Sequence, residues 1–439
     1  MENGHPEGDI VLLSPGECPV HNVRKMDDVL KIVRSKHIAN IPDAFAAAAV
    51  DPVNGELNIR EFLYDSIMYL DGDRHKNRRK LLNQLVQPDE VTTIREEILL
   101  PAADVMFERV ASEPDADGVR HMDLVEFLER IFLHLTAKLI GLAGIDTEEG
   151  LARLRSCAGP LAAGTSSGFL EDREVILEKA VEAKARYRDE FFRPGRARME
   201  EMLAEVAAGT RDEADVPVNW MRFVVEGADP AYADEDTAII ESTLLLAASV
   251  GTSTQSIIQT VGFLQDWFEK HPEDYERRTD LMFLLDALQE TVRLRAPFSP
   301  FTTRVAATDC EIAGTELTKG QELHIEWVAA NRDTSVFGDD ANEFNPYRPS
   351  PTVSGLQRYG VGFGTGIHQC LGLRLVLGTE GKGGAHIGLL QKLFLAGVKP
   401  DPDGEPEGLK LNPDKFWIEQ IPRYTKYPVL VTNWNPQGD

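Results

Sequence analysis

The chain has 439 residues, of which 42% are hydrophobic, and its formal net charge is −26 at pH 7. Such an acidic surface repels nucleic acid and anionic membranes, which argues against both as partners. The length allows a large core, and no Pro-, Gly- or Ser-rich linker divides the sequence, so we expect residues 1–439 to form a single domain.

Cysteine usage and hydropathy indicate a cytoplasmic protein. Cys18, Cys157, Cys310 and Cys370 lack the paired spacing of a zinc site or a disulfide framework, as expected in a reducing cytosol. No apolar run reaches the ~20 residues of a membrane span. The polar start of the chain, residues 1–10, does not resemble a signal peptide.

Apolar residues at three- and four-residue spacing predict helices through most of the chain. The expected helices cover residues 27–35, 73–87, 90–111, 122–142, 170–206, 234–271 and 281–294. The second of these is strongly basic, and the fifth is expected to be interrupted near Pro194-Gly195.

The β signal follows Pro297. Short strands are expected over residues 302–305, 310–312, 322–327 and 427–432. Turns are expected at Ala313-Gly314 and Lys319-Gly320. The sequence therefore predicts a mainly α protein with a smaller β-rich part.

A glycine-rich loop, residues 363–372, ends on Cys370 and precedes a helix-like run over 371–377. Gly364 and Gly366 lack a Cβ, so the backbone can take unusual dihedral angles and approach a flat cofactor closely. A cysteine at the N-terminus of a helix is favoured as the thiolate, because free N–H groups and the helix dipole stabilise negative charge. A thiolate presented in this way is suited to ligating haem iron.

This loop resembles the haem-ligand loop of the cytochromes P450, which reads Phe-x-x-Gly-x-x-x-Cys-x-Gly. Phe363, Gly366, Cys370 and Gly372 occupy its four fixed positions. The alternative is that Cys370 is a buried cysteine with a structural role only. The resemblance implies the cytochrome P450 fold, a haem b cofactor and Cys370 as the metal ligand.

Other segments are similar to the same family in the same order. Glu290 and Arg293 form a Glu-x-x-Arg pair, and residues 344–349 resemble the Phe-x-Pro-x-Arg segment, whose arginine here is Arg348. The resemblance implies that these three charged residues form a buried network that supports the haem and takes no part in the chemistry. Such a network is tolerable only when every charge is paired.

Four cationic residues match positions that contact the haem propionates in soluble bacterial members: His75, Arg79, Arg304 and His368. For the first two, a solvated basic face is the alternative. The remaining cations of that helix, Arg74, Lys76, Arg78 and Lys80, are expected to form a patch that attracts an acidic ferredoxin-type electron donor.

The central helix departs from the family pattern Ala-Gly-x-(Asp/Glu)-Thr. The matching residues are Ala248, Ser249, Val250, Gly251 and Thr252, so the threonine is present while glycine replaces the acid. Thr254 is a second candidate if the register shifts. Three outcomes follow: a monooxygenase with a water-based proton relay through hydroxyls, a poorly coupled monooxygenase, or a haem-thiolate enzyme that does not activate dioxygen.

Two further departures are visible. The chain before Asp27 is short, so the first elements of the family are expected to be truncated or rebuilt. The helix after Cys370 contains glycines at 378, 381, 383 and 384, although an internal glycine costs about 1 kcal/mol relative to alanine.

By resemblance, the substrate pocket is lined by residues from the central helix, from the turn after the Glu-x-x-Arg helix and from a C-terminal loop. These are Leu245, Ala248, Ser249, Thr252, Phe298, Pro300, Phe301, Phe416 and Trp417, with a lid over residues 52–69 and 164–169. Ordinary core packing is the alternative for the aromatic residues. Together they indicate an apolar small-molecule substrate.

The resemblance thus implies a haem-thiolate monooxygenase that receives electrons from NAD(P)H through a ferredoxin and its reductase. The main alternative is a haem-thiolate enzyme of another type, such as a peroxygenase, isomerase or dehydratase, because Gly251 stands where the acid is expected. A haem-binding sensor or carrier is a third possibility.

Overall fold

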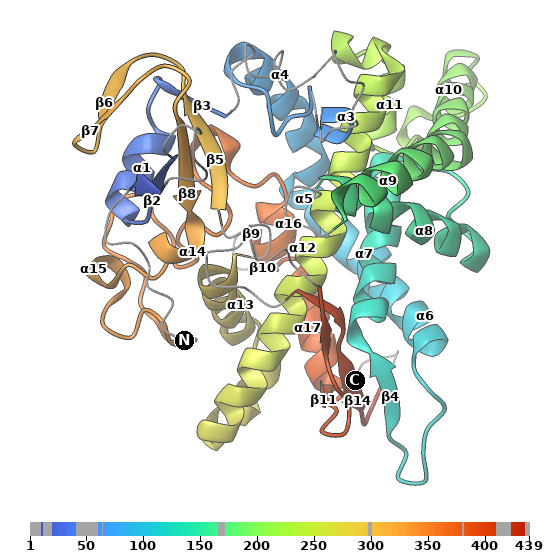
Figure 1. Cartoon of the computed structure of the whole chain (residues 1–439). Coiled ribbons are helices and arrows are strands. Elements are labelled where there is room, and N and C mark those ends of the chain that lie inside the picture. The colour runs from blue at the N-terminus through green and yellow to red at the C-terminus, as the bar shows by residue number, and fades with distance from the viewer. Residues whose placement is uncertain are drawn as a thin grey trace.

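The computed structural model of the chain describes residues 10–11, 20–40, 60–63, 65–165, 172–296, 301–379, 382–409 and 423–434. Figure 1 shows a small sheet with short helices on one side of the molecule and a large group of helices on the other. A long helix, α12 (Glu235–Lys270), runs across the helical part. The fold is mainly α with a smaller β-rich part, as predicted.

Several of the described helices begin at a residue whose side chain caps the first turn. For example, the carboxylate of Asp123 accepts from Val125 N at the start of α7 (Leu124–Ile140), and Gly141, with φ of 91°, ends this helix. The other helices are α1 (Met26–Val33), α3 (Arg60–Leu63), α4 (Gly72–Leu82), α5 (Pro88–Thr93), α6 (Leu100–Val110), α8 (Glu148–Thr165), α9 (Arg173–Tyr187), α10 (Arg193–Ala207), α11 (Trp220–Val225), α13 (Leu281–Arg295), α14 (Trp327–Ala330), α15 (Thr334–Phe337), α16 (Leu373–Leu377) and α17 (Ala385–Leu395).

Short turns of other helix types connect these elements. The π-helical segments are η2 (Ile94–Leu99) and η4 (Arg188–Phe192), and the 3-10 segments are η1 (Asn83–Val86), η5 (Glu213–Asp215), η6 (Pro230–Ala233), η7 (Pro272–Thr279) and η8 (Gly366–His368).

Among the described residues, the largest sheet has five strands in the order β1-β2-β8-β5-β3. These are β1 (Ile10–Val11), β2 (Val20–Val23), β8 (Glu322–Glu326), β5 (Phe301–Ala306) and β3 (Ile38–Ala39); β2 and β8 are parallel and the other neighbours antiparallel. Strands β1 and β2 thus lie in the part of the chain before Asp27.

Smaller sheets lie elsewhere. They are β11-β14-β4 (Lys399–Pro400, Pro428–Val431, Arg120–Asp123), β6-β7 (Cys310–Ile312, Thr315–Leu317), β12-β13 (Glu407–Gly408, Tyr424–Lys426) and β9-β10 (Gly378–Thr379, Lys382–Gly383). The β6-β7 turn is at Ala313 and Gly314, both with positive φ, as expected for a hairpin.

Two expectations were wrong in detail, and a third was confirmed. Residues 122–123 belong to strand β4 and not to a helix, because they pair with β14. The expected interruption near Pro194 and Gly195 is present: the π-helical segment Arg188–Phe192 separates α9 from α10, and both residues lie in the first turn of α10, where proline is tolerated. The run after Cys370 is not one helix, since α16 stops before Gly378 and a β hairpin follows.

The apolar side chains form two cores. The larger one lies between the helices and includes Phe107, Phe127, Leu246 and Phe283, all less than 2% exposed. The smaller one packs α1 against the main sheet. In the described ranges, no helix combines the length and the apolar character needed to cross a membrane.

Candidate functional site

The cysteine loop, residues 359–372, is shaped by glycines and by its own backbone. Gly360, Gly364 and Gly366 have φ of 59°, 66° and 70°, which L-residues with a side chain rarely adopt. Cys370 N donates to the carbonyl oxygen of Phe363 at 2.8 Å and so closes the loop. Phe363 anchors the loop in the larger core.

The loop packs directly on helix α13 and on Asn331. A Cβ on Gly362 would lie 2.6 Å from a methyl group of Val292, and one on Gly360 would lie 2.1 Å from the Asn331 side-chain oxygen. These close approaches explain why glycine is needed at both positions.

Cys370 is exposed in the structure although protein atoms surround its sulfur. The side chain is accessible to a water-sized probe, yet burial among protein atoms raises the pKa of its thiol. The backbone N–H groups of Gly372 and Leu373 and the Arg79 guanidinium act in the opposite direction and favour the thiolate. The helix that follows, α16, has only five residues, so these nearby N–H groups, more than a helix dipole, stabilise the charge.

A buried charge network supports the loop from below. Glu290, Arg293 and Arg348 are at most 2% exposed. Arg293 donates twice to the Glu290 carboxylate, each at 2.7 Å, and Arg348 Nε donates to the same carboxylate at 2.9 Å. The remaining N–H groups of both arginines donate to backbone carbonyls and to Asp340. The fold thus brings Glu290, Arg293 and Arg348 together, and each of these charges has a partner of opposite sign.

Asn331 joins this network to the cysteine loop, and the sequence pattern did not identify it. Its carbonyl accepts from Arg293 at 2.6 Å, and its side-chain oxygen accepts from Val361 N at 2.8 Å. Asn331 is 0% exposed. An isolated asparagine between two short helices carries no sequence signal for such a role.

Helix α12 presents small residues to open space. Ala248 and Gly251 are exposed and Thr252 is half-buried, although most of the helix is buried. A Cβ added at Gly251 would meet nothing within 4 Å. Thr254 is 1% exposed, so in this register Thr252 faces the open space.

The hydroxyl groups of this region are hydrogen-bonded. Thr252 Oγ1 donates to the carbonyl of Ala248 at 2.5 Å, and Thr136 Oγ1 of α7 donates to Ser249 Oγ at 2.8 Å. The second pair was not anticipated, because Thr136 lies more than a hundred residues away in the chain.

Of the four residues expected to contact the propionates, His75, Arg79 and His368 lie close to one another. The rings of His75 and His368 lie 4.4 Å apart. Arg79 donates to the carbonyls of Gln369 and Cys370, at 2.5 and 3.3 Å. Burial lowers the pKa of His75 to about 4, with further contributions from His368 and Arg79.

Arg304 differs from the other three. Burial lowers the pKa of its guanidinium, with Asp71 and Tyr69 acting in the opposite direction. Its side chain donates to Thr302 and Thr303, and no carboxylate of the described residues forms an ion pair with it. A deep guanidinium without a carboxylate partner is suited to an anionic group supplied from outside the chain.

Comparisons with known proteins point to one family. A sequence profile for cytochrome P450 matches residues 264–376. The 2-hydroxy-5-methyl-1-naphthoate 7-hydroxylase of Streptomyces carzinostaticus is 36% identical over 87 residues, 20% of this chain and 20% of that protein. The steroid C26-monooxygenase of Mycolicibacterium smegmatis is 28% identical over 268 residues, 49% of this chain and 57% of that protein.

The solved structure of HmtT, involved in himastatin biosynthesis, superimposes with a TM-score of 0.70 at 20% identity, covering 98% of this chain and 96% of that one. The chain therefore has the cytochrome P450 fold, and its residues 264–376 match the sequence profile of that family. The curated relatives align over only part of their length: the chain spans a fifth of the naphthoate hydroxylase and 57% of the steroid monooxygenase.

Cytochromes P450 bind haem, and the residues of this chain fit that group. Cys370 offers an accessible sulfur flanked by backbone N–H groups. Gly364 and Gly366 keep the backbone before it free of Cβ atoms. Arg304 offers positive charge that Asp71 stabilises from a distance, while no described carboxylate forms an ion pair with it.

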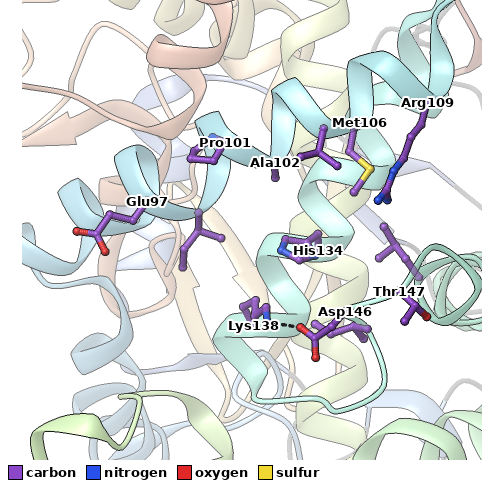
Figure 2. A pocket seen from close by; sticks show the side chains of 13 residues that line it. Glu97, Pro101, Ala102, Met106, Arg109, His134, Lys138, Asp146 and Thr147 are labelled. Atoms are coloured by element: carbon purple, nitrogen blue, oxygen red, sulfur yellow. Dashed lines mark hydrogen bonds and ion pairs between the residues drawn. The ribbon is translucent and has the colours of Figure 1, made fainter. Parts of the chain in front are cut away.

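A surface cavity of about 320 Å³ lies away from these residues (Figure 2). It is bordered by α6, α7 and the start of α8, and none of the cysteine-loop or Gly251 residues line it. Its cations are already paired, Lys138 with Asp146 at 2.6 Å and Arg109 with Glu148 at 2.5 Å. This cavity is therefore not the candidate site.

The expected basic patch on α4 is smaller than predicted. Arg78 does not belong to it, because Arg78 is 2% exposed and paired with carboxylates, and Arg74 pairs with Asp65. Part of the expected substrate pocket and lid lies outside the described residues. In the pocket these are Phe298, Pro300, Phe416, Trp417 and the side chain of Phe301, and in the lid residues 52–59, 64 and 166–169.

Proposed function

We propose that this chain is a cytochrome P450 monooxygenase in which Cys370 ligates the iron of haem b. The cysteine loop carries this proposal, because it presents an accessible sulfur among backbone N–H donors. The reaction is O₂ + 2e⁻ + 2H⁺ + RH → ROH + H₂O. Haem with a thiolate ligand supplies O–O cleavage, and the protein supplies binding, orientation and exclusion of water.

The cation set holds the two propionates in this proposal. Arg304 is the principal partner, because its guanidinium is partly buried and forms no ion pair with a described carboxylate. His75 and His368 add nearby donors. Arg79 acts at the carbonyls of Gln369 and Cys370, so it orients the loop in addition to contributing charge.

Protons reach the site through hydroxyl groups and water in this proposal. Thr252 and Ser249 supply the hydroxyls, and Thr136 fixes the orientation of Ser249 by donating to it at 2.8 Å. At Gly251 there is room for water, since nothing lies within 4 Å of the position that a Cβ would take.

The substrate is an apolar small molecule. Leu245 and Ala248 of α12 offer an apolar wall, and Ala248 is exposed within it. The relatives named above are a naphthoate hydroxylase and a steroid monooxygenase, so a ring-containing compound is the first class to test.

A ferredoxin-type protein supplies the electrons, which come from NAD(P)H through a reductase. Lys76 and Lys80 are exposed on α4, four residues apart and so on one face. Neither forms an ion pair with another described residue. They offer positive charge to an acidic partner on the same helix that contacts the cysteine loop through Arg79.

The alternative is a haem-thiolate peroxygenase, isomerase or dehydratase. The space beside Gly251 favours it, because the position of the usual acid is filled by no other described side chain. We also propose that residues 1–439 act as one domain, since the HmtT alignment covers 98% of the chain.

Two measurements test the proposal. The reduced carbon monoxide complex of the purified protein is expected to show the red-shifted Soret band of a thiolate ligand, which Cys370→Ser abolishes. Product formation is expected to require O₂ and NAD(P)H with ferredoxin and reductase. Turnover that persists without O₂ would support the isomerase or dehydratase reading, and turnover with peroxide alone would support the peroxygenase.

A further inference from the structure

A second buried charge network lies apart from the cysteine loop. Arg78 of α4 donates from Nε to Asp229 at 2.8 Å and from Nη1 to Glu241 of α12 at 3.1 Å. Arg78 is 2% exposed and Glu241 is 0% exposed. The guanidinium also lies 5.0 Å from the ring centroid of Tyr232.

This network fastens the backbone of the segment Asp65–Asp71, which we call the 65–71 strap. The Glu241 carboxylate accepts from Ile67 N at 3.1 and 3.3 Å. Arg78 also donates to the carbonyl oxygen of Asp65, and Arg74 donates to the Asp65 carboxylate. One end of the strap is thereby tied to both α4 and α12.

The other end of the strap is tied to the cysteine loop. Asp71 Oδ1 lies 3.0 Å from His368 Nε2, and Asp71 Oδ2 accepts from Asn40 N at 3.0 Å. His368 lies two residues before Cys370. Seven residues therefore connect the central helix to the loop that carries the cysteine.

The strap lies on the face of α12 that continues toward the open space. Glu241, Leu245, Ala248 and Thr252 are spaced four, three and four residues apart, which places them on one helix face. Ala248 on this face is exposed. A shift of the strap on α12 therefore alters the wall beside the residues that the proposed substrate contacts.

A role in stability alone is a poor explanation for this network. Removing two charges from water costs about as much as their attraction returns, so apolar residues could fill the same space without loss. Three carboxylates, Asp65, Asp229 and Glu241, share the two guanidiniums of Arg74 and Arg78. What these charges provide is a fixed geometry between four separate segments.

We propose that Arg78 and Glu241 are positioning residues that hold the 65–71 strap against α12 and thereby set the shape of the substrate pocket from outside it. This inference rests on the proposed function, since it concerns the same pocket. Neither side chain touches the substrate; both act through the strap backbone.

The test uses haem-loaded protein at pH 8 with Glu241→Gln and Arg78→Lys. Glutamine keeps an acceptor for Ile67 N without the charge, and lysine keeps the charge but cannot bridge Asp229 and Glu241 as the planar guanidinium does. The matched control is Glu235→Gln, a carboxylate of the same helix that pairs with Arg193 at 2.6 Å on the surface.

Two readouts are measured: amide hydrogen exchange of peptides covering 65–71 and of α17, and the affinity of the ferric protein for imidazole, read as a Soret shift. In each test variant the amides of the strap are expected to exchange at least tenfold faster, while those of α17 are unchanged. The imidazole dissociation constant is expected to change at least fivefold. Glu235→Gln is expected to change neither.

Parallel acceleration of exchange in the strap and in α17, with unchanged imidazole affinity, would overturn the inference and leave a general stabilising role. Unchanged exchange in the strap would also overturn it. Failure of the proposed function is separate: a wild-type carbon monoxide complex without the thiolate band would reject the haem-thiolate assignment, whereas the exchange result would stand on its own.

Discussion

Glu290 shows what a single residue does for the candidate site. It is 0% exposed and accepts from two arginines and from Asn345 N. Through Arg293 and Asn331 it is linked to Val361 of the cysteine loop. Loss of its charge leaves Arg293 without a carboxylate partner and Arg348 with Asp340 alone, so the loop loses support.

Glu290→Gln is therefore expected to lower the free energy of unfolding by about 3–5 kcal/mol and to reduce haem retention. Denaturant unfolding and the haem-to-protein ratio measure these effects. Glu200→Gln, which breaks a surface pair with Arg196 at 3.0 Å, is expected to cost less than ~1 kcal/mol. A Glu290 variant with normal stability and full haem content would contradict the supporting role.

Gly251 offers a test of the missing acid. A new side chain at this position meets no atom within 4 Å of its Cβ, so Gly251→Asp is expected to fold normally. If proton supply limits turnover, the new carboxyl raises the fraction of reducing equivalents that appear in product several-fold, since a placed acid contributes about 10²–10⁴-fold to proton transfer.

The control for this experiment is Gly251→Asn, which has nearly the same shape but no titratable proton. Product and peroxide are measured against NAD(P)H consumed. Equal coupling in the aspartate variant, the asparagine variant and the wild type would show that the absent acid does not limit the reaction.

Glu241 predicts a pH dependence of stability. Burial raises the pKa of its carboxyl to about 7 from an ordinary value of 4.5, although Arg78 and Ile67 N act against the rise. The folded state therefore binds this proton more tightly than the unfolded chain. The contribution to stability is fully present below about pH 4.5 and is lost as pH rises through about 7.

The difference in unfolding free energy between wild type and Glu241→Gln is expected to change by about 3 kcal/mol across this range. The wild type loses stability relative to the variant as pH increases. Denaturant titrations at several pH values measure the difference, and a pH-independent difference would show that Glu241 does not titrate there.

At the scale of elements, the hairpin between α16 and α17 is the clearest departure from a continuous helix. Gly378 ends α16 with φ of 89°, and β9 pairs with β10. Gly384 then fits against α16, where a Cβ would lie 2.4–2.6 Å from Val376 O, Gly378 N and Leu375 O. The glycines that appear unfavourable for a helix are required for this return of the chain.

Gly384→Ala is expected to destabilise the protein by about 1–3 kcal/mol, because backbone atoms must move to admit the methyl group. Since α16 follows Cys370 directly, the carbon monoxide complex is also expected to lose part of its thiolate band. Gly159→Ala in α8 is the control: a Cβ there meets nothing within 4 Å, so it is expected to be neutral or slightly stabilising. Equal effects of the two variants would contradict the role of Gly384.

The sequence predicted the long helices α12 and α13 well, because their apolar spacing is a local property. The sequence-based prediction failed where contacts between residues far apart in the chain determine the structure. The basic run of α4 suggested one exposed patch, yet Arg78 turns inward because Glu241, 163 residues later, offers it a partner. Residues 122–123 of strand β4 were assigned to a helix because their pairing partners in β14 lie some 300 residues away.

The candidate site shows the same limit. The motifs singled out Cys370, Glu290, Arg293 and Arg348 as candidates, since their residue types and order are distinctive. Asn331 and Asp71 carry no such pattern, and their roles follow only from the contacts that the fold creates.

At the scale of the whole molecule, charge distribution should govern how an electron donor docks. The net charge of −26 repels an acidic donor from most of the surface. Lys76 and Lys80 form a local exception on α4, the helix that contacts the cysteine loop through Arg79. An acidic ferredoxin is therefore expected to bind there, where the local potential favours it.

Lys76→Glu/Lys80→Glu is expected to slow ferredoxin-dependent reduction at least ~10-fold at low ionic strength, because electrostatic steering changes association rates by 10–10³. The deficit should shrink to about twofold at 0.5 M salt, where the screening length falls to a few ångströms. Lys179→Glu/Lys270→Glu, an exposed pair on α9 and at the end of α12, makes the same change in net charge. If both double variants slow reduction equally, total charge and not the α4 surface controls docking; if only the first does, the donor approaches the face beside the cysteine loop.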